Sequence, residues 1–162
     1  MTLAFLKSPE GADPIVVEGT FKAAPDQVFR AWTSPDEVKK WFGQRPDALA
    51  TAEIDLKVGG VWRFAFEAME AHQDVVGGTY ATVEPGSRLA FSWIHERIFP
   101  DGRVEKTPAS EVTVTFEAVE DGTFVRLVHA AIRAEDARKG VGQGWNASFG
   151  AIQTALDAEP VA

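Results

Sequence analysis

Four polar side chains in this 162-residue sequence could do chemistry in a buried site. His95 and His129 lie at the ends of alternating apolar runs, where an imidazole can hydrogen-bond a ligand or move a proton. Tyr80 adds a hydroxyl and Trp93 an indole N–H on the same apolar faces. The set predicts orienting hydrogen bonds in an otherwise apolar pocket, or general-base chemistry by one histidine.

The alternative for these groups is structural. Each could be satisfied by a backbone or loop carbonyl at the margin of a sheet. We favour this alternative for the two histidines, because strand alternation places no Asp or Glu on their face, and Glu96 points away from His95.

Metal, covalent and phosphate chemistry find little support in the spacing. His72 lies in a turn near Asp74, but no histidine pair has metal-ligand spacing, so we expect no metal and no cofactor. Cysteine is absent, and Ser148 is not in a nucleophile-elbow motif. The glycine-rich run 140–144 lacks the Lys and Ser or Thr of a phosphate loop, which favours a hinge before the last helix.

Composition and charge indicate one acidic globular domain. Hydrophobic residues make up 45% of the sequence, which is enough for one core, and we expect residues 15–158 to form it after an N-terminal extension 1–14. The net charge of -8 argues against nucleic-acid or anionic-membrane partners. The first fifteen residues resemble neither a signal peptide nor a membrane span, and the absence of cysteine fits a reducing compartment, so a cytoplasmic location is predicted.

Turn and cap signals divide the chain into elements. A strand at 15–22 is followed by a helix opened by Pro25 and a second one, with a capping box of Ser34 and Glu37, ended by Gly43. Strands then follow, joined by glycine-containing hairpin turns and therefore antiparallel. Their predicted ranges are 51–56, 61–68, 75–84, 88–96, 111–119 and 123–131.

The segment 97–108 is predicted to be a long loop that acts as a flap at one rim of the sheet. This loop or an edge strand is available to pair with a second copy of the chain, which leaves a homodimer open. A solvated edge is equally compatible with the sequence.

Aromatic residues dominate one face of the predicted sheet and one stripe of the predicted last helix, 141–156. On the strands they alternate with charged residues, so one face is buried and one is solvated. The helix stripe also contains the small residues Gly144 and Ser148, which leave room where a solid core would need volume. The candidate pocket wall is Trp62, Phe64, Phe66, Phe91, Trp93, Phe116, Trp145 and Phe149.

Five sequence strings in the same order resemble one family over nearly the whole chain. They are VVEGTFKAAPDQVFRAWTSPDEVKKWFG (16–43), VGGVWRF (58–64), GTYATVEPGSRLAFSW (78–93), VTVTFEAVEDGTFVRLVHA (112–130) and GWNASFGAIQTAL (144–156). The chain resembles the START-like or SRPBCC superfamily, in the branch related to the activator of the heat-shock protein 90 ATPase. The resemblance implies an α+β helix-grip fold, in which a curved antiparallel sheet wraps round a long C-terminal helix, with two short helices after the first strand.

The resemblance also implies a deep pocket between the sheet and the last helix, which the superfamily uses for lipids, hormones and polyketides and in some branches for catalysis. We therefore expect a small, largely apolar ligand held by the aromatic wall, with Tyr80, His95 and His129 as orienting groups. A cyclase- or dehydratase-like enzyme using His95 or His129 is the alternative. Chaperone stimulation is a third reading, disfavoured because the residues before Ile15 leave no room for the separate chaperone-binding domain of the eukaryotic activator.

Overall fold

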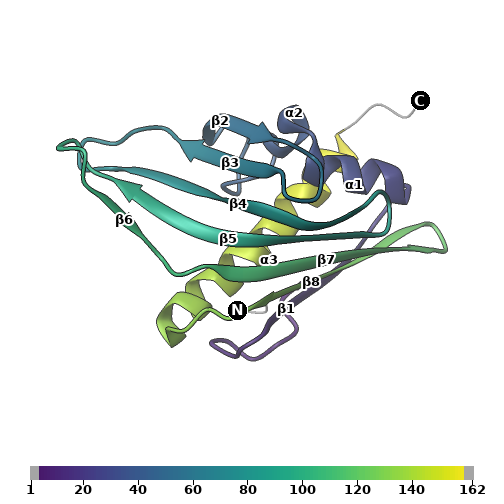
Figure 1. Cartoon of the computed structure of the whole chain (residues 1–162). Helices are drawn as coiled ribbons and strands as arrows, with labels where there is room; N and C mark the ends of the chain where they lie inside the picture. The colour runs from purple at the N-terminus through teal and green to yellow at the C-terminus, as the bar shows by residue number, and fades with distance from the viewer. Residues whose placement is uncertain (1–3, 159–162) are drawn as a thin grey trace.

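The structure, a computed structural model, describes residues 4–158. It is an α+β fold of the helix-grip type, in which an antiparallel sheet curves round one long helix (Figure 1). The helices are α1 (Pro25–Thr33), α2 (Pro35–Val38) and α3 (Glu135–Asp157). The strands are β1 (Ile15–Phe21), β2 (Leu49–Ile54), β3 (Val61–Phe66), β4 (Gln73–Glu84), β5 (Arg88–Ile98), β6 (Val104–Lys106), β7 (Ser110–Val119) and β8 (Gly122–Ala130).

The sheet order is β1-β8-β7-β5-β4-β3-β2, with β6 paired to β5 and every pair antiparallel. Neighbours in the chain pair through hairpins, as predicted, while β1 returns to close the far edge against β8. Helices α1 and α2 lie near the C-terminal end of α3 (Figure 1). One face of the sheet therefore meets α3 along its length, and this face carries the core.

Three local predictions were wrong. The segment 97–108 contains the short strand β6, which pairs Ile98 with Val104, so it is a hairpin and not only a loop. The capping box at Ser34 makes no side-chain hydrogen bond, because the Glu37 carboxylate binds the Lys40 ammonium at 3.1 Å instead. The glycine run 140–144 is not a hinge, since it lies inside the continuous helix α3.

Helix α3 continues through its glycines because contacts outside the helix hold it. Each glycine in a helix costs about 1 kcal/mol relative to Ala. The Arg138 guanidinium offsets part of this cost by donating to the carbonyl oxygens of Gly11 (2.6 Å) and Ile132 (2.9 Å), which ties the first turns to the preceding segments. A Cβ at Gly142 would meet Leu6 at 3.6 Å, so the helix packs closely there.

The segment before β1 also packs on α3. Asn146 accepts hydrogen bonds through Oδ1 from the backbone N–H groups of Phe5 (2.7 Å) and Leu6 (3.0 Å). The Glu18 N–H donates to the Phe5 carbonyl at 2.9 Å, and the Phe5 ring lies 5.8 Å from that of Phe149. The described part of the N-terminal extension therefore contacts both β1 and the helix.

A hydrogen-bond chain fastens α3 to the sheet through His129. The Trp145 indole N–H donates to His129 Nδ1 at 3.1 Å. Because an indole only donates, Nδ1 carries no proton, and Nε2–H donates to Ser110 Oγ at 2.7 Å. Burial lowers the pKa of His129 to about 4, against a smaller opposing effect of the Asp13 charge, so the imidazole stays neutral in this chain.

No helix in the described part of the chain is long and apolar enough to cross a membrane.

The buried imidazole gives stability a defined pH dependence. The unfolded chain takes up a proton at the ordinary histidine pKa of 6.5, whereas folded His129 resists protonation until about pH 4. We expect this group to withdraw up to about 3 kcal/mol of unfolding free energy as the pH falls from 6.5 to 4. Its stabilising contribution is complete above pH 6.5, and the loss levels off below pH 4.

The variant His129→Gln lacks this titration and serves as the comparison. Urea unfolding of both proteins across this range should show their difference in unfolding free energy shrinking as the pH falls. A difference that does not change with pH would contradict the neutral, buried state of His129. Carboxylates other than Asp13, whose charge acts on His129, affect both proteins alike and cancel.

Candidate functional site

Three cavities lie beside α3, and a small void lies deeper in the aromatic core. One of the three, of about 430 Å³, lies against the C-terminal part of the helix at Ala151 and Thr154. The other two share residues with each other. The central cavity, of about 270 Å³, lies between α3 and the strands β3 to β5. Its walls are Phe42, Gly43, Gln44, Phe66, Asp74, Val76, Trp93, His95, Val141, Gly144, Trp145 and Ser148. The side cavity, of about 420 Å³, shares Val76, Trp93, His95 and Val141 with it and extends toward the segment 131–134 before α3.

Small residues on α3 make part of this space. Gly144 and Ser148, which the sequence analysis expected to leave room beside the apolar stripe, both line the central cavity. A Cβ added at Gly144 would meet only the Gln44 Nε2 atom, at 3.6 Å. The neighbouring Phe149 and Ile152 are fully buried, so the helix is packed solidly on one side of its stripe and leaves space on the other.

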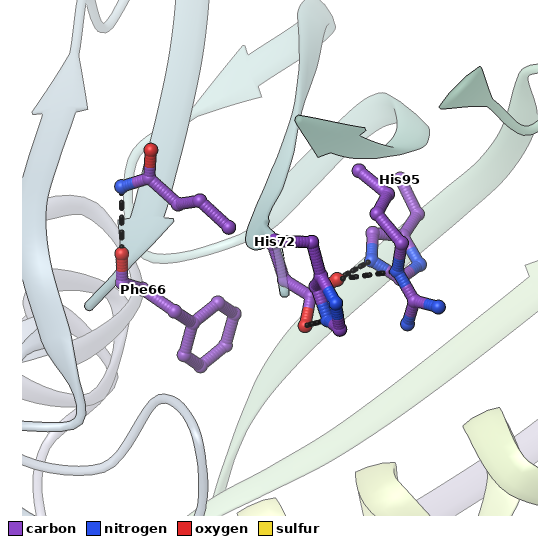
Figure 2. Close-up of polar contacts among 6 residues, drawn as sticks. Phe66, His72 and His95 are labelled. Atoms are coloured by element: carbon purple, nitrogen blue, oxygen red, sulfur yellow. Dashed lines mark hydrogen bonds and ion pairs between the residues drawn. The ribbon is translucent and has the colours of Figure 1, made fainter. Parts of the chain in front are cut away.

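One polar cluster interrupts the apolar wall of the central cavity (Figure 2). We call it the polar corner: Asp74, His95, Arg97 and His72. Asp74 Oδ1 lies 3.0 Å from His95 Nε2 and accepts from Arg97 Nε at 3.3 Å, while Oδ2 lies 3.3 Å from His72 Nε2. Asp74 and His95 line the cavity, so a carboxylate and an imidazole face the same space.

The charge of Asp74 is held by its neighbours. Partial burial opposes ionisation, but the hydrogen bonds and the positive charges of His95 and Arg97 outweigh it and lower the pKa of Asp74 below its ordinary value. With Asp74 ionised, a neutral His95 donates its Nε2–H to that carboxylate and leaves Nδ1 as the basic nitrogen. The polar corner can therefore orient a polar group of a ligand or accept a proton.

The prediction that no carboxylate accompanies His95 was wrong. Asp74 lies just before the predicted strand 75–84. Alternation within the predicted strand 88–96, which carries His95, says nothing about a residue on the neighbouring strand. Strand β4 begins at Gln73 and pairs Asp74 with Arg97, which puts His95 diagonally across from Asp74 on the same face. The missed signal was therefore the register between two neighbouring strands.

The structure divides the predicted site residues into three groups. Phe66, Trp93, His95 and Trp145 line the central cavity. Trp62, Phe64, Tyr80 and Phe91 line a void of about 20 Å³ inside the aromatic core, which Trp93 and Trp145 also border.

Phe116, His129 and Phe149 line neither the central cavity, nor the side cavity, nor the void in the aromatic core. Phe116 packs edge-on against Phe29 with ring centroids 5.3 Å apart, and Phe149 is fully buried between Phe21 and Trp32. His129 is held by Trp145 and Ser110, as described above. These three side chains support the site from outside it.

Several lining residues were not among the predicted site residues. Phe42, Gln44 and Val76 line the central cavity together with Asp74. Phe42 follows α2, so its approach to α3 depends on the path of a loop that alternation does not report. Trp41, its neighbour, is instead part of the core and donates its indole N–H to the Ala31 carbonyl at 2.8 Å.

No group of three or more His, Asp or Glu side chains in the described part of the chain is arranged to hold a metal ion.

The fold and the cavity beside the long helix define a helix-grip protein of the SRPBCC type. The chain belongs to the family described as "Activator of Hsp90 ATPase homolog 1-like protein", whose model matches residues 22–157. No curated protein sequence matches the chain significantly.

Solved structures share this fold over nearly the whole chain. Protein MLL2253 from Mesorhizobium loti is 25% identical, with 91% of this chain and 99% of that one covered and a TM-score of 0.71. Protein CV1439 from Chromobacterium violaceum is 21% identical, with 91% and 100% covered and a TM-score of 0.73. DynU16, described as a protein in the dynemicin biosynthetic locus, is 20% identical, with 91% of this chain but 48% of DynU16 covered and a TM-score of 0.70.

The polar corner makes a prediction that needs no ligand. Carbon-13 NMR titration of the Asp74 carboxyl should give a pKa below the ordinary aspartate value, because His95 and Arg97 stabilise its charged form. In His95→Gln the pKa of Asp74 should rise toward the ordinary value, whereas Arg103→Gln should leave it unchanged, since Arg103 stacks on Phe99 instead. An Asp74 pKa at its ordinary value in the unmodified protein would contradict the geometry.

Proposed function

We propose that this protein binds a small, largely apolar molecule in the central cavity between α3 and the sheet. The observation that carries the proposal is the composition of the cavity wall, in which aromatic and aliphatic side chains surround the polar corner and two further polar residues, Gln44 and Ser148. Ligand sites are typically apolar spaces of this kind with a few placed polar groups. The cavity of about 270 Å³ suits a compact ligand, and the adjoining side cavity leaves room for a longer one.

The residues in and around the proposed site have different roles. Phe66, Trp93 and Trp145 supply apolar contact, and burial of ligand surface against them provides the free energy of binding. His95, held by Asp74, supplies the hydrogen bond that orients the ligand. His129 and Phe149 contribute indirectly, because they fix the position of α3, which forms the roof, whereas Phe116 packs against Phe29 in the core.

The relatives add limited support. DynU16 is described as belonging to a biosynthetic locus, which fits a protein that handles a small molecule. The description of the family names a chaperone activator. That activity requires an outer surface that binds another protein, whereas our proposal rests on the largely apolar cavity beside α3.

Filling the cavity from its roof tests the proposal. We expect 1-N-phenylnaphthylamine, a neutral apolar fluorophore, to bind saturably, and fatty acids, aromatic polyketides or steroid-like compounds to compete for the same site. Gly144→Leu should weaken binding by about tenfold or more, because a Cβ at this position has room while the longer side chain enters the cavity.

The matched control is Ala147→Leu on the same helix. Ala147 is exposed and lines none of the cavities in the described residues, so its affinity for the fluorophore should match that of the unmodified protein. Absence of saturable binding to the unmodified protein, or equal binding by Gly144→Leu and Ala147→Leu, would sink the proposal.

A second candidate function is proton transfer by His95. The contact between Asp74 and His95 favours it, because a carboxylate that holds one imidazole nitrogen leaves the other as a base, and His95 lines the central cavity. Such a base would remove a proton from a carbon next to a ligand carbonyl. The electron pair of the broken C–H bond would form the enolate, and the proton would move to His95 Nδ1. Return of the proton at the same carbon regenerates the ketone.

Deuterium exchange measures this step directly. 2-Tetralone incubated with the protein in D₂O should lose its α-proton NMR signals faster than with buffer alone, and His95→Gln should abolish the acceleration. Asp74→Asn should reduce it without preventing 2-tetralone from binding. Exchange equal to buffer in the presence of saturating protein would rule out this activity and leave the binding proposal standing.

A further inference from the structure

Trp32 carries a buried hydrogen-bond donor without a partner. Its side chain on α1 is 5% exposed, and its indole Nε1 is the one buried side-chain nitrogen or oxygen in residues 4–158 that makes no hydrogen bond. The indoles of Trp41, Trp62 and Trp145 donate to the Ala31 carbonyl, the Ser92 carbonyl and His129. Leaving a buried donor unpaired is unfavourable, so this exception needs a physical reason.

The space beside Trp32 is the aromatic void of about 20 Å³, which Trp32 lines. A void of this size admits one water-sized group. Phe42, Trp93 and Trp145 line both this void and the central cavity, so these three rings form a wall that the two spaces share. A ligand that extends past this wall would reach the void that Trp32 lines.

The void has a definite chemical preference. Its lining residues Trp32 and Tyr80 each carry a polar group for which the structure shows no hydrogen-bond partner, as does Trp93, which also lines the central cavity, and no charged residue lines the void. Burial raises the pKa of Tyr80, so its hydroxyl keeps its proton and can donate. An oxygen placed here meets two donors, which suits a carbonyl with two lone pairs, whereas a carboxylate would be buried without a positive partner.

We propose that the aromatic void is the closed end of the ligand site and that the Trp32 N–H donates a hydrogen bond to a neutral carbonyl oxygen of the ligand. The inference rests on the proposed binding function and narrows it to apolar ketones, aldehydes or esters. The Tyr80 hydroxyl donates the second hydrogen bond. The carbonyl points into the core, and the rest of the ligand occupies the central cavity next to His95.

Two probes of equal shape isolate the hydrogen bond. 2-Acetylnaphthalene carries a carbonyl where 2-isopropenylnaphthalene carries a =CH₂ group, so both fill the same space and only the ketone accepts a hydrogen bond. Calorimetric titration of each gives the affinity ratio of ketone to alkene. In Trp32→Phe we expect this ratio to fall at least about fivefold, because the variant removes the donor and any change of cavity size affects both probes alike.

Tyr80→Phe should lower the ratio in the same direction, since it removes the second donor and keeps the ring. Infrared spectroscopy of the ¹³C-labelled ketone bound to the unmodified protein supplies a readout that does not depend on any variant folding. Its carbonyl band should lie at lower wavenumber than in cyclohexane, and closer to the cyclohexane position in Trp32→Phe, which keeps only the Tyr80 donor.

The outcomes distinguish failure of the hydrogen bond to the carbonyl from failure of the proposed ligand binding. If both probes bind with the same ketone-to-alkene ratio in the unmodified protein and in Trp32→Phe, or if the bound carbonyl absorbs as in cyclohexane, the inference fails while ligand binding stands. A water molecule that stays on Trp32 with the ketone bound gives that same result. If neither probe binds, the inference and the proposed binding function fail together.

Discussion

The hydrogen bond from Trp145 to His129 is the interaction on which the arrangement of this molecule depends. A single helix that covers a curved sheet can slide or rotate, because apolar contact is not directional. The chain from Trp145 through His129 to Ser110 sets both the height and the rotation of α3 over β8 and β7, since each hydrogen bond requires its own geometry. The neutral imidazole is well suited to this position, because it accepts from the helix and donates to the sheet at once.

Fixing α3 at this point is what allows space to remain beside it. Phe149 and Ile152 fill the core on one side of the helix, and the hydrogen-bonded Trp145 stands at the boundary. On the other side Gly144 and Ser148 contribute little volume, and the sheet does not collapse onto them because the packed side already holds the separation. The cavity thus results from the positions of large and small residues on α3, together with the hydrogen bond that holds Trp145 in place.

The sequence was sufficient for features that depend on local pattern. Alternation and turn residues located the strands and hairpins of the sheet, and Pro25 and Pro35 marked α1 and α2. It was insufficient where a distant contact decides the outcome. The start of α3 depends on Arg138 reaching Gly11, and the partnership of Asp74 with His95 depends on the register of β4 against β5. Neither relation is written in the spacing of nearby residues.

The same difference explains which polar groups in the core are structural and which are available to a ligand. His129 and Trp145 satisfy each other, so their chemistry is used up in holding the fold, although their residue types resemble those of a catalytic site. Trp32 and His95 contrast with them. The Trp32 indole N–H has no hydrogen-bond partner, and His95, which lines the central cavity, has a second ring nitrogen that Asp74 does not bind. A buried polar group with every hydrogen bond made favours a single packed state. A group with a bond left to make favours binding. In this protein Trp145 contacts both kinds, because its ring stacks on Trp32 and meets His129 edge-on, and it borders the void and the cavity alike.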